Sequence, residues 1–122
     1  MPSADKKEME LLKTPSSAAL TWASTFTHTD YGSRAARVGH VGILSLNCTS
    51  SLTTVFTSPV QIATIPEGYR PKWEFSQGIV PNNGNGDESP YVNITTAGAI
   101  KVGGFTTSKS KGFRVNLVYA LA

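Results

Sequence analysis

The sequence is poor in the groups that cross-link secreted domains or anchor chains in membranes. Its one cysteine, Cys48, excludes an intrachain disulfide. Because Cys48 lies in an apolar, β-forming stretch, we expect a small core residue rather than a nucleophile. A lone cysteine also fits assembly in a reducing cytosol. No stretch approaches the ~18 apolar residues of a membrane-spanning helix. The N-terminal stretch carries acids and lacks the apolar region of a signal peptide, so we expect no secretion signal.

Charge is also scarce. Only 16% of the 122 residues are charged and 39% are apolar, which argues against a disordered or solvated tail. Eleven basic and eight acidic residues give a formal charge of +3, but the basic residues are scattered and follow no nucleic-acid-binding motif. We therefore expect one folded domain with a mildly basic surface and no nucleic-acid partner.

Groups that carry catalysis are few. His28 and Asp30 stand two apart and would share a face of a strand, although a polar loop is the simpler interpretation. No nucleophile elbow and no metal-spaced Cys/His cluster is present. A sugar-cleaving pair of acids has no fixed sequence spacing; the candidates are Glu67, Glu74, Asp87 and Glu88. The sequence predicts no enzyme, no metal site and no cofactor.

What the sequence does contain is a series of short β-forming segments separated by turn residues. Residues 1–17 include a helix-like stretch at 5–13 and a TPSS linker, and are expected to be a tether or short helix. Residues 18–122 are expected to form the domain, with about seven strands. The expected strands are 20–26, 37–49, 60–65, 72–75, 91–95, 99–102 and 113–122. This pattern predicts an all-β fold, an antiparallel β-sandwich or small β-barrel.

In two of the expected strands, the alternation of residues indicates which side chains share a face. In 37–49, Leu44, Leu46 and Cys48 alternate with a second set that includes Val41 and Ile43. Apolar residues on both faces exceed what one sandwich interior needs, so the excess predicts a subunit interface. The last strand alternates most clearly, and we expect it to be central in its sheet.

Binding is better supported than catalysis, because the chain has many amphipathic aromatic residues. Rings stack on the apolar faces of sugars, and Asn, Asp and Glu bond their hydroxyls. The polar loop 82–90 follows Trp73 and precedes Tyr91, and loops on a rigid β scaffold commonly carry recognition. We expect a ligand-binding rim formed by Trp73, Asn82, Asn83, Asp87, Glu88 and Tyr91.

The order of several motifs resembles the C-terminal head domain of tail-tip and baseplate receptor-binding proteins from phages of Gram-positive hosts. Residues 37–46 resemble an R-x-G-x-V…L-x-L strand, and residues 65–71 (IPEGYRP) are similar to the family's proline–glycine–tyrosine turn. Residues 92–100 resemble a V-x-I-x-x-x-G-x-I hairpin, and 113–119 a closing strand. Of these motifs the turn is the most specific, and the match spans residues 37–119.

The resemblance implies a homotrimer of β heads on the virion, at the tail tip or baseplate, assembled in the host cytoplasm. It implies reversible adhesion to saccharides of the host cell envelope, contacts with other tail proteins, no cofactor and no membrane insertion. It transfers no binding residues, and the turn residues Gly68 to Pro71 are expected to be architectural. Two other functions stay open at this point: a purely structural tail or fibre component, and a polysaccharide depolymerase module.

Overall fold

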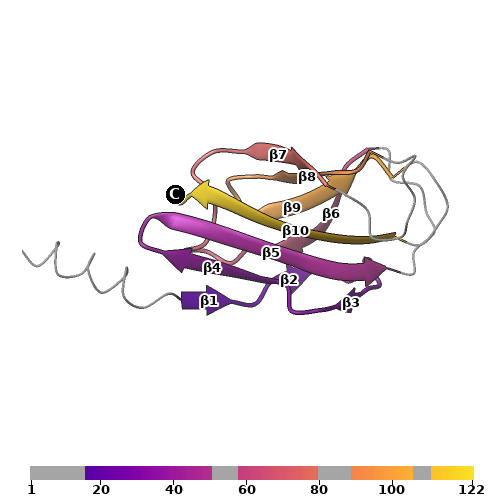
Figure 1. The fold of residues 1–122 in the computed structure, drawn as a ribbon, viewed down its shortest axis with the longest axis horizontal. Helices are drawn as coiled ribbons and strands as arrows, with labels where there is room; N and C mark the ends of the chain where they lie inside the picture. Colours follow the sequence, from indigo (N-terminus) through magenta and orange to yellow (C-terminus); the bar gives the residue numbers. More distant parts are fainter. Residues whose placement is uncertain (1–15, 51–57, 80–88, 106–110) are drawn as a thin grey trace, which may run out of the picture.

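The computed structural model describes residues 16–50, 58–79, 89–105 and 111–122. Within them lie ten antiparallel β-strands in two sheets and no helix (Figure 1). The expected all-β antiparallel sandwich is therefore confirmed. The helix-like stretch at 5–13 lies outside the described residues. The described residues contain no helix that is long and apolar enough to cross a membrane.

The first sheet is built around one long antiparallel pair of ten-residue strands. Its strands are β1 (Ser16–Ala18), β3 (Thr29–Asp30), β4 (Arg34–Val38), β5 (Val41–Ser50) and β10 (Lys111–Ala120). Their order is β1-β4-β5-β10, and β3 also pairs with β5 beyond the end of β4. The β5–β10 register runs unbroken from Lys111↔Ser50 to Ala120↔Val41.

The second sheet has the order β2-β6-β9-β8-β7. Its strands are β2 (Thr21–Trp22), β6 (Val60–Thr64), β7 (Phe75–Gly78), β8 (Tyr91–Ile94) and β9 (Ala99–Gly103). The expected hairpin at residues 96–98 is present, because Thr95 N donates to Ala99 O and Gly98 N donates to Thr95 O. Gly98 has a φ of +84°, which the turn requires.

The core lies between the sheets, and the period-two patterns place it there. Along β5 the inward residues Leu44, Leu46 and Cys48 are at most 1% exposed. Along β10, Leu117 and Tyr119 are buried, while the alternating residues Asn116, Val118 and Ala120 are exposed. The second sheet contributes side chains that are all fully buried: Ile62, Val92, Ile94, Ile100 and Val102. Each such side chain contributes roughly 1.5–3 kcal/mol through burial.

Three details differ from the expected strands. The strand 37–49 is in fact two strands, because Gly39, with a φ of +60°, and His40 form a turn between β4 and β5. The short strand 72–75 begins later, at Phe75. The expected strand 20–26 is reduced to β2, which covers only Thr21–Trp22. The first difference arises because a single glycine reverses the chain where the residue pattern alone predicts a continuous strand.

The last strand is also placed differently, since β10 ends the strand order of its sheet instead of lying at the centre. Its far end nevertheless joins the two sheets. Lys72 N donates to Ala120 O, and Ala122 N donates to Arg70 O. The segment that leads into β7 thus continues the ladder for a few residues, with Pro71 bridging to Leu121. Pairing partners depend on tertiary contacts, which strand periodicity does not specify.

Candidate functional site

Trp73 is the most exposed aromatic side chain among the described residues. It retains 65% of its surface, next to Lys72, whose Nζ lies 5.0 Å from the centroid of the indole ring. Its backbone is held firmly, because Pro71 is buried and Lys72 N is bonded to Ala120 O. A large ring on a fixed backbone, exposed to water, contributes little to the core and is suited to stacking on a ligand.

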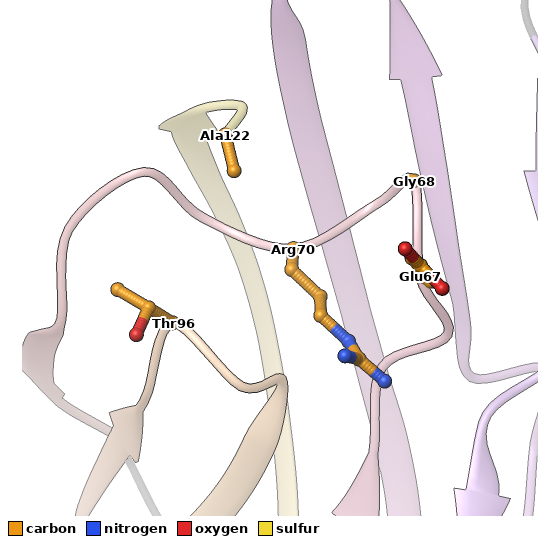
Figure 2. Close-up of a pocket in the computed structure, with 5 residues that line it drawn as sticks. All are labelled: Glu67, Gly68, Arg70, Thr96 and Ala122. Atoms are coloured by element: carbon orange, nitrogen blue, oxygen red, sulfur yellow. The ribbon is translucent and has the colours of Figure 1, made fainter.

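Trp73 stands at one end of the sandwich, where several turns meet; we call this the turn end. Arg70, three residues before Trp73, lines a hollow of about 410 Å³ (Figure 2). The hollow is formed by three segments that are distant in sequence, and its lining residues are Glu67, Gly68, Arg70, Thr96 and Ala122. Its volume falls in the range of small-ligand sites. The Glu67 carboxylate, the Arg70 guanidinium and the Thr96 hydroxyl give it both acceptors and donors.

The turn 65–71 builds this end through a set of backbone contacts. Arg70 Nε donates to Ile65 O at 2.8 Å, and Tyr69 N donates to Pro66 O. Tyr119 Oη, from β10, donates to Tyr69 O at 2.7 Å. Arg37 Nη1 donates to Gly68 O at 2.8 Å. Because Ile65 N also donates to Gly98 O in the turn between β8 and β9, this segment is tied to both sheets and presents the hollow on a fixed frame. These contacts agree with the expected architectural role of the turn.

Of the expected rim residues, the structure describes only Trp73 and Tyr91. Asn82, Asn83, Asp87 and Glu88 lie outside the described residues. Tyr91 pairs with Gly78 at the far end of β7, whereas Trp73 precedes the near end at Phe75. At about 3.4 Å per residue, this register separates the two aromatics by more than 10 Å along the strand. Tyr91 is half-buried and packs over Gly103 of β9. The structure thus places Trp73 and Tyr91 at opposite ends, not on one rim.

Sequence reasoning alone did not find the turn-end hollow. In the sequence, Glu67 is a candidate acid for hydrolysis and part of the 65–71 turn, and no pattern marks Thr96 or Ala122 as ligand-binding residues. The hollow exists because the β8–β9 hairpin and the end of β10, which bridges to Pro71, bring these segments together. The only available signal was the turn motif at 65–71, which marks a constrained backbone but no ligand.

The other polar candidates are engaged in local structure. His28 Nδ1 lies 2.8 Å from Phe26 O, and the His28 ring packs 4.0 Å, between centroids, from Trp22. The Asp30 carboxylate accepts from Ser33 N at 2.8 Å, so its hydrogen bond caps a turn and does not orient His28. No group of three His, Cys, Asp or Glu residues in the described part of the chain is placed to hold a metal ion.

Among the described residues, Cys48 and Tyr119 have pKa values that are clearly shifted. Burial, with a smaller contribution from the charge of Asp30, raises the pKa of the Cys48 thiol to about 12. Burial raises the pKa of Tyr119 to about 12 as well. A thiol that stays protonated at neutral pH is a weak nucleophile. Cys48 is therefore a core residue, as its alternation along β5 predicts.

Comparison with known proteins identifies solved structures that share this fold. No protein-family model and no curated protein matches the sequence. Among solved structures, the receptor-binding protein (gp15) of Listeria phage PSA is similar, with a TM-score of 0.66 and 13% identity over 98% of this chain and 73% of that one. The head domain of lactococcal phage bIL170, a receptor-binding domain, is similar with a TM-score of 0.68 and 17% identity, over 89% of this chain and 100% of that one. The chain therefore has the fold of phage receptor-binding heads, which confirms the resemblance at the level of fold.

Proposed function

We propose that this chain is a receptor-binding head of a phage tail that adheres reversibly to saccharides of the host cell envelope. The proposal places it on the virion, at the tail tip or baseplate, in contact with other tail proteins. It binds without a cofactor and without cleaving its ligand. Residues 1–17 would connect the head to the rest of the tail, although Ser16 and Ser17 already pair with β4 as part of β1.

The observation that carries this proposal is the exposed Trp73, which follows Arg70 of the mixed polar hollow by three residues. Carboxylate, guanidinium and hydroxyl groups together bond the hydroxyls of a neutral sugar, while an indole face covers its apolar side. The fold shared with two phage receptor-binding heads supports the same function. A purely structural tail component would not need an exposed tryptophan on a rigid frame.

The test is an array of bacterial glycans probed with the wild-type chain and with Trp73→Ala. Because the ring is mostly exposed, the variant should keep its melting temperature within a few degrees and lose most of its glycan binding. Val60→Ala, which trims another exposed apolar side chain on β6, should change neither. Equal glycan binding by the wild type and Trp73→Ala would remove the turn end as the binding site. Cleaved glycan in the wild-type reaction would favour the depolymerase alternative.

We also propose that three copies associate through the outer face of the first sheet. The register aligns Ala36, Ile43 and Val118 in one row, and Val38, Val41 and Ala120 in the next. Val118 is 70% exposed and Val41 is 42% exposed. This aliphatic face therefore contains the apolar residues in excess of the sandwich core that the sequence predicts. Association of copies would remove it from water.

Sedimentation tests this second proposal. Wild type should sediment as a trimer at tens of micromolar, and Val118→Asp should shift it towards monomer because a buried carboxylate is costly. Val60→Asp makes the same change on the second sheet and should leave the trimer intact. A monomeric wild type, or equal effects of the two substitutions, would refute the interface.

A further inference from the structure

The outer face of the first sheet carries a second hollow, far from Trp73. It has a volume of about 460 Å³ and is lined by Tyr31, Asn47, Thr49 and Arg114. We propose that this hollow binds the anionic group of a charged saccharide, a sugar that carries a phosphate or a carboxylate. The inference rests on the proposed function for the class of its ligand, but it assigns a different site with a different charge preference.

The four side chains are aligned by strand register. Arg114 of β10 stands directly opposite Asn47 of β5, and Thr49 is the next outward residue along β5. On the other side of β5, Tyr31 N donates to Asn47 O at 2.8 Å. Opposed residues on adjacent strands lie about 5 Å apart, so Tyr31, Asn47 and Arg114 form one row across three adjacent segments. The backbone that holds this row is rigid, because it belongs to the central ladder of the sheet.

Their polar groups are available to a ligand. Ser33 Oγ bonds the backbone N and O of Asn47, but among the described residues no hydrogen bond or ion pair engages the side chains of Tyr31, Asn47, Thr49 or Arg114. Tyr31 is 58% exposed, and Arg114 and Thr49 are also exposed. The guanidinium can donate two parallel hydrogen bonds to a phosphate or carboxylate, and the Asn47 amide and Thr49 hydroxyl can donate to further oxygens. The Tyr31 ring supplies a face for the sugar itself.

The charge of this face separates it from the turn end. The described acids are Asp30, Glu67 and Glu74, and none of them lines the hollow. Asp30 is the nearest in sequence, but it pairs with the buried Cys48, so its place in the register faces away from Asn47. A second arginine, Arg34, is exposed on the same outer face, opposite Ser45. At the turn end, by contrast, Glu67 would repel an anion, and Arg70 Nε is already bonded to Ile65 O.

The hollow stays accessible in the proposed trimer. Arg114 lies four residues from Val118 along β10, which is about 14 Å in an extended strand. The aliphatic rows occupy one end of the face and the hollow occupies the other. Binding of the ligand and association of copies thus use different parts of one sheet.

The test is a titration of the ¹⁵N-labelled full chain followed by NMR, with glucose 6-phosphate, glucuronate, glucose and inorganic phosphate as separate probes. We expect the charged sugars to shift the Asn47 side-chain amide and the Thr49 and Arg114 backbone amides. Glucose and inorganic phosphate should bind at least severalfold more weakly. A preference between glucose 6-phosphate and glucuronate identifies the anionic group.

Arg114→Gln should weaken binding of the preferred charged sugar at least about tenfold, since it removes hydrogen bonds made to a charged group. The matched control is Arg34→Gln, which removes the same charge from the same face. Its backbone position is about 12 Å from that of Arg114, beyond the ~8 Å screening length at physiological salt, so it should change the affinity less than threefold. Equal losses in the two variants, or no shift at Asn47 and Thr49, would overturn the inference.

The outcomes also separate this inference from the proposed function. If Trp73→Ala keeps glycan binding while Arg114→Gln loses the charged sugar, the turn-end site fails and the second site stands. If Trp73→Ala loses glycan binding while Arg114→Gln behaves as Arg34→Gln does, the second site is refuted and the proposed function stands. Binding of inorganic phosphate as tightly as glucose 6-phosphate would refute the saccharide part of the inference.

Discussion

Gly98→Ala tests whether the turn end is held together as the structure indicates. Gly98 has a φ of +84°, and a Cβ built there would lie 2.5 Å from Ile65 O and 2.7 Å from Arg70 Nε. The positive φ costs an alanine about 1–2 kcal/mol. Displacing the Ile65–Arg70 contact adds an overpacking cost of about 1–3 kcal/mol. The free energy of unfolding should therefore fall by about 2–5 kcal/mol.

Two other glycines separate these two costs. Gly68 has a φ of +93° with nothing within 4 Å of its Cβ position, so Gly68→Ala carries only the backbone cost of about 1–2 kcal/mol. Gly78 lies in β7 with open space around it, so Gly78→Ala should stay within about 0.5 kcal/mol of wild type. The predicted order of destabilisation is Gly98, then Gly68, then Gly78.

Thermal melts at one protein concentration measure this order. For a chain of this length, 1 kcal/mol corresponds to about 4 °C in Tm. Gly98→Ala should then melt about 8–20 °C below wild type, and Gly68→Ala about 4–8 °C below. If Gly98→Ala and Gly68→Ala have the same Tm, the close approach of Arg70 to the 95–98 turn does not contribute to stability. The frame proposed for the hollow is then wrong.

Two further predictions follow from the buried titrating groups. A thiol that ionises near pH 9 when unfolded and near pH 12 when folded favours the folded state below pH 9; this stability is lost as pH rises towards 12, by up to about 4 kcal/mol. Tyr119 adds a loss between about pH 10 and 12. Urea melts from pH 8 to 11 should show the decline, and a flat profile would contradict it; Cys48→Ala should decline less. Iodoacetamide should alkylate Cys48 at pH 8 only after denaturant is added, and rapid alkylation of the native protein would contradict its burial.

The sequence was sufficient to predict the fold class because alternation survives in the longest strands. Leu44, Leu46 and Cys48 face inward along β5 as their spacing predicts, and the same holds for Leu117 and Tyr119 of β10. Strand boundaries were less predictable where glycine acts on the backbone. Gly39 turns the chain between β4 and β5, and Gly42 leaves room for the Tyr119 ring, which a side chain at that position would meet. The turn at Gly39 and the space at Gly42 both depend on a partner strand that the local sequence pattern does not identify.

The binding residues are harder to predict than the fold, because the register of strand pairing decides which residues line a hollow. Trp73 was identified by its chemistry, and its exposure agrees with a ligand-facing role. Its grouping with Tyr91 assumed that neighbours in sequence are neighbours in space, and the β7–β8 pairing places them at opposite ends. Arg114 and Asn47 are 67 positions apart in the chain and stand opposite each other. Only knowledge of the pairing brings such residues into one site.

The character of both hollows explains why a repeated head would be needed for firm adhesion. Each hollow offers three or four polar side chains and one ring or none, and neither encloses its ligand. Sites of this kind bind in the millimolar range, which corresponds to only about 4 kcal/mol. In the proposed trimer, three linked heads would raise the effective concentration of each further site to about the millimolar level, so each additional contact would multiply the overall affinity. A change such as Val118→Asp should therefore weaken cell adhesion far more than binding of a single sugar, even though Val118 lines neither hollow.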